Sequence, residues 1–180
     1  MYPTSLDLSL ASWLHSHAAP GLTRIMLAIT NLHSNLAINL MSAALGILLL
    51  KHRQRDWLVA LILAVPVGLA INVMLKHLFA LSRPTFDDPL LSLETYSFPS
   101  GHAAGATLFY GFLVAYFRHR TGDPRIRALQ VAFAATLVGV VAFSRIYLGV
   151  HYLSDVVAAI AWSLAWLALC LWLRKRPLAR

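Results

Sequence analysis

The sequence predicts an all-α integral membrane protein, with about five transmembrane helices and a short helix at the N-terminus that lies on the membrane surface. Hydrophobic residues make up 59% of the 180 residues and charged residues only 12%, whereas a soluble domain carries about twice that share of charge. The mean hydropathy is +0.68, and several apolar runs reach the roughly 20 residues that a helix needs to cross a bilayer. The length fits a single membrane-embedded domain, residues 1–180.

The positions of the basic residues predict how the chain lies in the membrane. The formal net charge of +8 could indicate a nucleic-acid partner, but eleven of the fifteen Lys and Arg fall in three short segments, 51–55, 118–127 and 174–180. Each segment follows a candidate span that would end on the same side, which the positive-inside rule assigns to the cytoplasm. We therefore expect a multi-pass protein of the cell (inner) membrane with a cytoplasmic C-terminus, and no nucleic-acid partner.

The N-terminal part predicts one surface helix and one span. Residues 1–20 mix leucines with polar residues and are too broken to cross a bilayer, so we expect an interfacial helix on the non-cytoplasmic surface. The first span runs from about 24 to 50. Within it, Asn31, Asn35 and Asn39 form a polar stripe at helical spacing. Hydrogen bonding between helices is the favoured interpretation of this stripe, and a polar transport pathway is the alternative.

A second span is predicted from about 57 to 81, with a kink near Pro66 and Gly68. The following segment, 85–98, carries acidic residues and prolines and cannot lie in the membrane. We expect it to be an outside loop that acts as a lid or selects the substrate.

Three further spans complete the predicted bundle. The third opens at the tetrapeptide 99–102 and ends near Phe117, the fourth covers about 126–143, and the fifth covers about 151–173. A loop, 144–150, is expected between the last two. This order brings the outer ends of the second, third and fifth spans to one membrane face, where the polar residues of these segments gather.

The stretch S-R-I-Y-L-G-V-H-Y-L-S-D, residues 144–155, carries the strongest chemical signal. His151 and Asp155 are four residues apart, so they share one face if a helix begins near His151. A carboxylate bound to one imidazole nitrogen fixes the tautomer and leaves the other nitrogen free to act as a nucleophile. Arg145 lies six residues earlier, where a turn could bring its guanidinium onto an anion. The combination indicates phosphoryl chemistry.

Two other segments complete a three-part pattern: Lys76 followed after six residues by Arg83-Pro84, and the tetrapeptide P-S-G-H at 99–102. The three segments together resemble the signature of the type 2 phosphatidic acid phosphatase superfamily, which includes membrane lipid phosphatases. All eleven signature positions are filled, in order and with the expected spacing within each motif. The resemblance covers residues 57–173, which we take as the phosphatase core.

The resemblance implies a set of phosphate-binding residues. Lys76, Arg83 and Arg145 would supply positive charge to the phosphate oxygens. The Ser100 hydroxyl and the backbone N–H of Gly101 would donate hydrogen bonds at a helix N-terminus, which favours anions. So many buried polar groups near a membrane surface are costly unless they bind a functional anion.

The resemblance also implies the catalytic residues. His151 would attack phosphorus to form a phosphohistidine, and Asp155 would hold its other ring nitrogen. His102 would protonate the leaving oxygen and then activate the water that cleaves the intermediate.

We expect no metal and no cofactor, and hence metal-independent activity. Asp87, Asp88 and Glu94 could bind a divalent cation, but a solvated loop is the favoured interpretation of this acidic segment. The expected partners are the bilayer and a lipid phosphate substrate; the oligomeric state is left open.

The function that follows is a membrane lipid phosphatase whose active site faces the periplasm or exterior. The resemblance favours a lipid phosphate or diphosphate of the undecaprenyl diphosphate, phosphatidylglycerophosphate, phosphatidate or lipid A type. The alternatives are a membrane lipid transporter, for which the asparagine stripe is the hint, and a non-catalytic phospholipid-binding relative.

Overall fold

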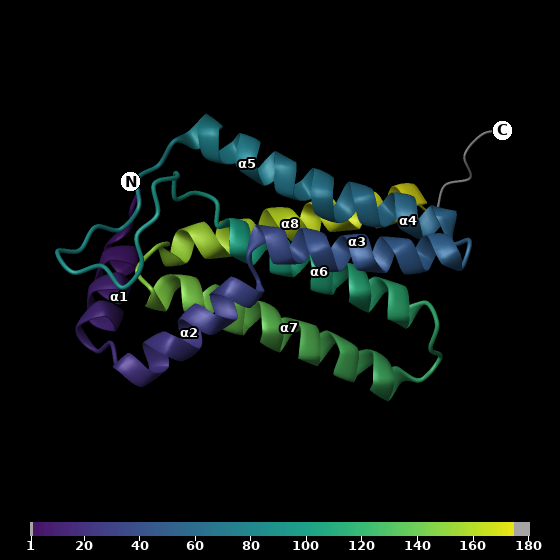
Figure 1. Cartoon of the computed structure of the whole chain (residues 1–180), viewed down its shortest axis with the longest axis horizontal. Coiled ribbons are helices and arrows are strands. Elements are labelled where there is room, and N and C mark those ends of the chain that lie inside the picture. The colour runs from purple at the N-terminus through teal and green to yellow at the C-terminus, as the bar shows by residue number, and fades with distance from the viewer. Residues whose placement is uncertain (1, 175–180) are drawn as a thin grey trace.

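The computed structural model describes residues 2–174, and this part of the chain is helical with no β-strand (Figure 1). The helices after residue 34 run lengthwise in a bundle, and a long loop closes one end of it. In chain order the elements are α1 (Ser5–Ser16), α2 (Pro20–Leu32), α3 (Asn35–Lys51), α4 (Arg55–Ile62), the π-helical segment η1 (Leu63–Val67), α5 (Gly68–Phe79), α6 (Gly101–Arg118), α7 (Pro124–Tyr147) and α8 (Leu153–Arg174).

Helix α6 is the central helix of the bundle. It packs most extensively against α7 and α8 and also contacts α5, α3 and η1. Its first two turns are built from small residues, Gly101 and 103–106, all of them buried. Small side chains let helix backbones approach closely, so this sequence allows several helices to surround the N-terminal half of α6.

Three helical segments of the described chain are long and apolar enough to cross a membrane: Arg55–Phe79, Pro124–Tyr147 and Leu153–Arg174. The bent pair Pro20–Leu32 and Asn35–Lys51 would make a fourth if it forms one span. Helix α6, the remaining predicted span, does not meet this test. It is enclosed by other helices, so its sequence does not need the continuous apolar surface of a lipid-facing helix.

The first predicted span, 24–50, is not one helix. The chain bends by 45° between α2 and α3, and the Ser34 side chain caps α3 by accepting a hydrogen bond from the Ala37 N–H at 3.2 Å. Asn31 therefore belongs to α2, while Asn35 and Asn39 belong to α3. The asparagine stripe is interrupted, and the Asn39 amide donates to the Asn35 carbonyl of its own helix at 2.8 Å. Among the described residues, Asn39 makes no hydrogen bond to another helix.

The second predicted span is one long helical segment with a π-helical turn at its proline. Pro66 lies inside Leu63–Val67, and a proline has no N–H for the regular helical ladder. The indole N–H of Trp166 donates to the Leu63 carbonyl at 2.9 Å. Gly68 follows at a close helix crossing, because a Cβ there would lie 2.7 Å from a methyl group of Leu108.

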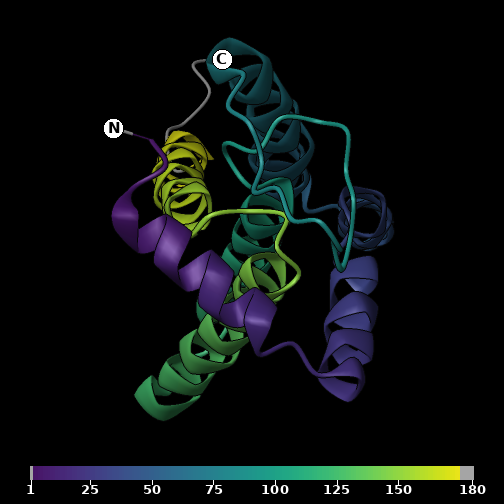
Figure 2. The ribbon, with the colours of Figure 1, turned by 90° about the vertical axis from the view of Figure 1, so that its left-hand side faces the viewer.

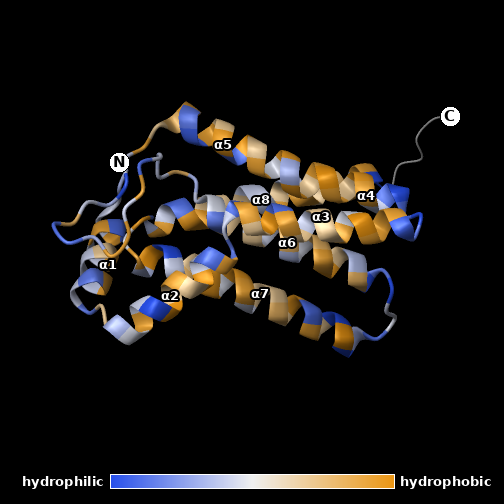
Figure 3. Ribbon diagram, in the orientation of Figure 1, coloured by the Kyte–Doolittle hydropathy of each residue, from blue (hydrophilic) through white to orange (hydrophobic). Residues whose placement is uncertain are grey.

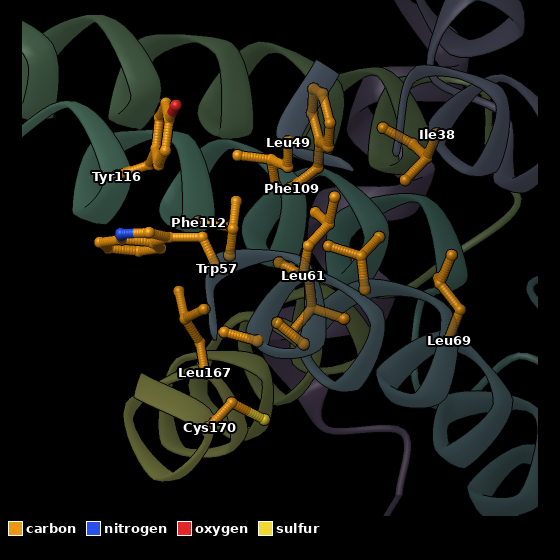
Figure 4. Close-up of a cluster of buried hydrophobic side chains, with 14 residues drawn as sticks. Ile38, Leu49, Trp57, Leu61, Leu69, Phe109, Phe112, Tyr116, Leu167 and Cys170 are labelled. Carbon is orange, nitrogen blue, oxygen red and sulfur yellow. The ribbon is translucent and has the colours of Figure 1, made fainter. Parts of the chain in front are cut away.

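A hydrophobic cluster joins α3, α4, α5, α6 and α8 (Figure 4). Trp57 packs edge-on against Phe112, with 5.8 Å between ring centroids, and against Tyr116 at 5.2 Å. Cys170 is buried in the same cluster as a free thiol. This packing holds the five helices together.

Helix α1 lies across the other end of the bundle, over the ends of α7 and α8 (Figure 2). Thr4 and Asp7 form a capping box at its start. Leu6, Leu8 and Trp13 stay exposed, as expected for a helix that lies on a membrane surface. The buried Asp7 carboxylate also accepts a hydrogen bond from the Ser154 N–H at 2.9 Å, so it docks α1 on the first turn of α8.

Two predicted boundaries near the chemical motif differ from the structure. Helix α7 continues to Tyr147, so Ser144 and Arg145 lie in its last turns and not in a loop. The longer α7 is compatible with the apolar residues 146–148, which are buried against the bundle. Helix α8 begins at Leu153, two residues after His151.

The described basic segments gather at the bundle end far from α1, where Figure 3 shows hydrophilic residues at the ends of the helices. The Arg174 guanidinium reaches Asp56 at 2.9 Å, which places the end of α8 beside the start of α4. The other three cations of the predicted 174–180 segment lie outside the described residues.

Candidate active site

All eight predicted site residues lie toward the end of the bundle that carries α1 and the 80–100 loop (Figures 1 and 2). They come from six parts of the chain. Their positions are Lys76 in the last turn of α5, Arg83 in the loop, Ser100, Gly101 and His102 at the start of α6, Arg145 near the end of α7, His151 between α7 and α8, and Asp155 in the first turn of α8.

His151 and Asp155 form the expected pair, although not on one helix face. The Nδ1 atom of His151 lies 3.3 Å from Oδ2 of Asp155, and both side chains are buried. Asp155 is the third residue of α8, and its Oδ2 also accepts the Tyr152 N–H at 2.9 Å. The carboxylate thus caps the helix and orients the imidazole at the same time.

The other nitrogen of the His151 ring faces a cation. Nη1 of Arg83 lies 3.2 Å from Nε2 of His151, and a guanidinium can only donate. Nε2 must therefore accept, which puts the ring proton on Nδ1. Burial lowers the pKa of His151 to about 3, and the charges of Arg83, Arg145 and Lys76 also lower it. The hydrogen bond to Asp155 raises the pKa but does not outweigh these effects. The imidazole is neutral near pH 7, with its lone pair on Nε2.

Lys76 and Arg83 are held by backbone carbonyls. The Lys76 ammonium donates to the carbonyls of Tyr96 and Ser97 at 2.7 and 2.9 Å. Arg83 donates from Nε to the Thr95 carbonyl and from Nη1 to the Val150 carbonyl, each at 2.6 Å. These bonds fix the two cations without neutralising them.

Arg145 is only 1% exposed, and its Nη1 donates to the hydroxyl of Thr30 on α2. The ion pairs found among residues 2–174 involve none of the cations Lys76, Arg83 and Arg145. A buried charge without a partner is costly. The cluster therefore has the charge of a site that binds an anion.

Two buried donors in this cluster have no hydrogen-bond partner among residues 2–174. The hydroxyl of Ser100 and Nε of Arg145 make no hydrogen bond among the described residues. Ser100 is the N-cap residue of α6, yet its side chain does not cap the helix. A buried polar group without a partner calls for an explanation, and an anion at the N-terminus of α6 would satisfy both donors.

Gly101 leaves room at the same helix terminus. A Cβ at this position would lie 3.1 Å from the amide nitrogen of Asn35 and 3.6 Å from that of Asn72. The backbone of the first α6 turn thus lies close to two side-chain amides. The Ser100 N–H donates to the Asp155 carbonyl at 3.2 Å, which ties the start of α6 to α8.

The His102 ring is partly exposed and makes no hydrogen bond with residues 2–174. Its position is close enough to Arg145, His151, Lys76 and Arg83 for their charges to act on it. A histidine with free ring nitrogens beside a nucleophile can donate and accept a proton.

The structure adds two donors to Asp155 that the motifs do not contain. Ser97 donates its hydroxyl to Oδ2 at 2.5 Å and lies 3.3 Å from Nδ1 of His151. Tyr2 donates its hydroxyl to Oδ1 at 2.8 Å. Burial raises the pKa of Tyr2, so its phenol remains protonated. Ser97 stands two residues before the P-S-G-H motif, but nothing in the sequence signals a role for Tyr2.

The 85–98 segment forms one wall of a cavity beside Arg83. The cavity has a volume of about 360 Å³, and it is lined by several residues of the loop between 81 and 96 and by Gly149 and Val150. Gly149 has a φ of +68°, and a Cβ there would meet the Phe86 ring at 2.9 Å. The two catalytic histidine candidates do not line this cavity. A substrate-selecting role of the loop stays a prediction.

The acidic residues of the loop are not gathered into a metal site. Oδ1 of Asp88 pairs with Nε2 of His15 on α1 at 2.8 Å, and His15 stacks on Phe86 with 4.0 Å between centroids. Within residues 2–174, no group of three or more His, Cys, Asp or Glu is arranged to hold a metal ion. Metal-independent activity stays a prediction.

Comparison with known proteins identifies relatives of the chain. The PAP2 superfamily model matches residues 57–178. The chain is 29% identical over 139 residues to phosphatidylglycerophosphatase B of Bacillus subtilis, covering 76% of this chain and 68% of that protein. It is 37% identical over 128 residues to decaprenylphosphoryl-5-phosphoribose phosphatase of Mycobacterium tuberculosis, covering 68% of this chain and 63% of the relative.

Two solved structures have the same fold. The crystal structure of a transmembrane PAP2-type phosphatidylglycerolphosphate phosphatase from Bacillus subtilis superposes with a TM-score of 0.84 at 24% identity, covering 97% of this chain and 88% of that one. The crystal structure of Aquifex aeolicus LpxE gives a TM-score of 0.72 at 23% identity, covering 95% and 98%.

The family model spans all three motifs, whose residues converge on one end of a helical membrane bundle. Its relatives are phosphatases, several of them named for lipid substrates. The chain therefore belongs to the PAP2 superfamily, and it is a membrane lipid phosphatase.

Proposed function

We propose that the protein removes a phosphate from a lipid phosphate or diphosphate through a phosphohistidine on His151. The observation that carries this proposal is the cluster of Lys76, Arg83 and Arg145, none of which is paired with a carboxylate among residues 2–174. The cluster lies beside a neutral imidazole whose Nε2 accepts. A phosphate dianion would neutralise the excess positive charge and would lie in front of the nucleophile.

The phosphate oxygens would be bound by three kinds of donor. The guanidinium of Arg83 and the free Nε of Arg145 supply charge-assisted bonds, and the Lys76 ammonium adds a point charge. The orphan hydroxyl of Ser100 and the N–H groups of the first α6 turn complete the shell. This arrangement stabilises the charge that builds up on the equatorial oxygens during phosphoryl transfer.

The first chemical step forms a P–N bond and breaks a P–O bond. Nε2 of His151 attacks phosphorus, and His102, protonated in the substrate complex, gives its proton to the leaving oxygen of the lipid. Asp155 accepts the Nδ1 proton of His151 in a hydrogen bond and stabilises the positive charge of the phosphorylated ring.

The second step releases inorganic phosphate. The neutral His102 removes a proton from a water molecule as the water attacks phosphorus, and the P–N bond breaks. His151 returns to its neutral form, and His102 is protonated again for the next turnover. The chain's own side chains supply every proton transfer of the cycle, so the proposed reaction needs no metal.

The substrate class follows from the position of the site. The site lies at the ends of α5, α7 and α8, and the ends of membrane spans lie at the level of the lipid headgroups. We therefore favour a glycerolipid or isoprenoid phosphate, with phosphatidylglycerophosphate, phosphatidate, undecaprenyl diphosphate and lipid A as candidates. The described basic segments lie at the opposite end, and this supports an active site on the periplasmic or outer side of the inner membrane.

Of the alternatives, lipid transport rested on the asparagine stripe, and the bend between α2 and α3 interrupts that stripe. A non-catalytic lipid-binding protein would not need a neutral nucleophile aligned by a buried carboxylate. No observation favours either alternative over hydrolysis.

The test is phosphate release by the purified protein in detergent, with EDTA present, from a panel of the four candidate lipids. We expect turnover by the wild type and by the control His52→Ala, whose exposed histidine lies at the far end of α3. His151→Ala should show no turnover. Release by His151→Ala at the wild-type rate, or no release from any lipid, would overturn the catalytic assignment.

The covalent intermediate has its own test. Wild-type protein that is quenched in alkali during turnover of a lipid labelled in its phosphate should carry acid-labile label, because the phosphohistidine forms before water cleaves it. His151→Ala should carry none. Equal label on the wild type and His151→Ala, or no label on the wild type during turnover, would contradict a phosphohistidine on His151.

A further inference from the structure

A second cavity lies at the end of the bundle opposite the active site. It has a volume of about 470 Å³ and is bounded by α4, α6, α7 and α8. Three arginines from three different helices line it, together with apolar side chains. The arginines are Arg118 of α6, Arg127 of α7 and Arg174 of α8, and the apolar lining includes Trp57, Val114 and Leu171.

Arg174 is held in place before any ligand binds. Its guanidinium stacks over the Trp57 ring at 3.8 Å, and its Nη1 donates to Oδ2 of Asp56 at 2.9 Å. Its side chain is only 13% exposed, and its Nε is buried without a hydrogen-bond partner among the described residues. One donor of this fixed guanidinium therefore has no partner among the described residues.

Arg127 is also positioned by the protein, because its Nε donates to the Thr121 carbonyl at 2.9 Å. Arg118 forms no ion pair with residues 2–174. Asp56 is the only carboxylate paired with any of these three arginines in the described chain. The cavity thus carries excess positive charge, with planar donors suited to a phosphate.

The depth and lining of the cavity favour a lipid over a soluble anion. Arg174 is the last residue of one candidate span, and Arg127 and Trp57 lie in the first turns of the other two, so the arginines lie at the level of the headgroups. Below them Trp57, Val114 and Leu171 provide an apolar wall that a bare phosphate would not use. Basic pockets between helices at this depth can bind the headgroups of anionic lipids.

We propose that this cavity binds the phosphate of an anionic phospholipid from the leaflet opposite the active site. The arginines contact the phosphate, and the apolar wall contacts the start of the acyl chains. The bound lipid joins the ends of α6, α7 and α8. None of the residues that line the cavity belongs to the active site, so this site stands or falls independently of the proposed reaction.

The chain offers a matched control for simple surface charge. Arg120 and Arg125 belong to the same basic segment but do not line the cavity. Arg120 lies over the Tyr116 ring at 4.5 Å, and Arg125 is exposed. The double variants Arg118→Gln/Arg127→Gln and Arg120→Gln/Arg125→Gln lose the same charge from the same membrane face.

The experiment counts bound lipids by native mass spectrometry. Wild type and both double variants are purified in a neutral detergent, stripped of lipid and titrated with phosphatidylglycerol or phosphatidylcholine. We expect preferential retention of phosphatidylglycerol, about tenfold weaker in Arg118→Gln/Arg127→Gln and within about twofold of wild type in the control. Lipid bound at the active site contributes equally to all three proteins. Equal losses in both double variants, or no preference for phosphatidylglycerol, would overturn the proposal.

A second arm separates a lipid from a soluble phosphate. Inorganic phosphate is added to the phosphatidylglycerol complex, and we expect little displacement because it cannot use the apolar wall. Displacement at an equal concentration would assign the site to a soluble anion and would overturn the lipid proposal.

Thermal unfolding provides a further readout, because a ligand that binds only the folded state raises Tm. Phosphatidylglycerol should raise Tm of the wild type and the control by more than it raises Tm of Arg118→Gln/Arg127→Gln, in which only lipid bound elsewhere contributes. If the double variant does not fold, the single variant Arg118→Gln is used, since its exposed side chain forms no ion pair with the described residues. A full lipid-dependent rise in Tm in that variant would count against the site.

Discussion

Burial and hydrogen bonding shift the pKa of His151 in opposite directions. Burial and the nearby cations Arg83, Arg145 and Lys76 lower the pKa to about 3, whereas the bond to Asp155 opposes this shift. The result is a neutral ring with a defined tautomer, since Arg83 donates to Nε2. A neutral imidazole is what nucleophilic attack on phosphorus requires.

The lowered pKa predicts how stability depends on pH. An unfolded histidine takes up a proton near pH 6.5, but folded His151 does so only near 3. Between these values the unfolded chain binds more protons, so the free energy of unfolding falls on acidification by up to about 1.4 kcal/mol per pH unit. The effect is absent above about pH 6.5, where both states are neutral at this residue.

This dependence is measured as Tm in detergent between about pH 7.5 and 5. His151→Gln should show a flatter profile than the wild type because it lacks the titrating group. The control His52→Gln, at an exposed position, should follow the wild type. A His151→Gln profile as steep as that of the wild type would contradict the prediction.

At the scale of elements, the N-terminal segment and α8 together fix the position of the Asp155 carboxylate, which orients His151. Asp7 docks α1 on the first turn of α8, and Tyr2 reaches Oδ1 of Asp155. The Tyr2 ring packs edge-on against Tyr152, with 5.6 Å between centroids. The N-terminal segment thus helps to hold the carboxylate that orients His151, the proposed nucleophile.

We predict that Tyr2→Phe lowers kcat about tenfold and leaves KM within about twofold. A hydrogen bond to a charged group contributes roughly 1.5–3 kcal/mol, and without it the Asp155 carboxylate can rotate away from His151. The phenylalanine ring keeps the packing against Tyr152, so Tm should change little. The measurement is steady-state phosphate release together with thermal unfolding.

The matched control is Tyr110→Phe, which removes a hydroxyl that bonds Nε2 of His33 at 2.8 Å, outside the site. Its kcat should equal that of the wild type. Similar losses in the two variants, or a change confined to KM for Tyr2→Phe, would argue against a positioning role of Tyr2.

At the scale of the whole molecule, charge and chemistry are separated along the bundle. The catalytic candidates lie at the end with α1 and the 80–100 loop, and the described basic segments lie at the other end (Figures 1 and 3). Because basic loops stay in the cytoplasm, this separation predicts the side from which the enzyme meets its substrate.

Cysteine labelling in intact cells tests that orientation. Asp87→Cys places a thiol on the exposed loop near the active site, and Gly122→Cys places one in the loop between α6 and α7. A membrane-impermeant maleimide should label Asp87→Cys in intact cells and Gly122→Cys only after permeabilisation. The native Cys170 is buried and should give little background. The reverse labelling pattern would place the active site in the cytoplasm.

Much of the fold and of the candidate site could be predicted because the signals are local in the chain. Apolar runs between basic segments predict the helices. The spacing of Lys76, Arg83 and the two later motifs predicts the candidate site residues, which the fold brings together at the end of the bundle with α1. The same local reading missed the bend within the predicted span 24–50. Its apolar content gives no sign of the bend after α2, because the Ser34 cap and the packing around α6 determine where α3 begins.

By itself the sequence determined that this is a helical membrane protein with the residues of a PAP2 phosphatase, since composition and motif spacing follow from the order of residues alone. Only the tertiary structure decided which groups surround them. Thr30 holds Arg145, Ser97 and Tyr2 bond Asp155, and three arginines meet around the far cavity. The physical reason is that these contacts join residues far apart in the chain, so they exist only once the helices have packed.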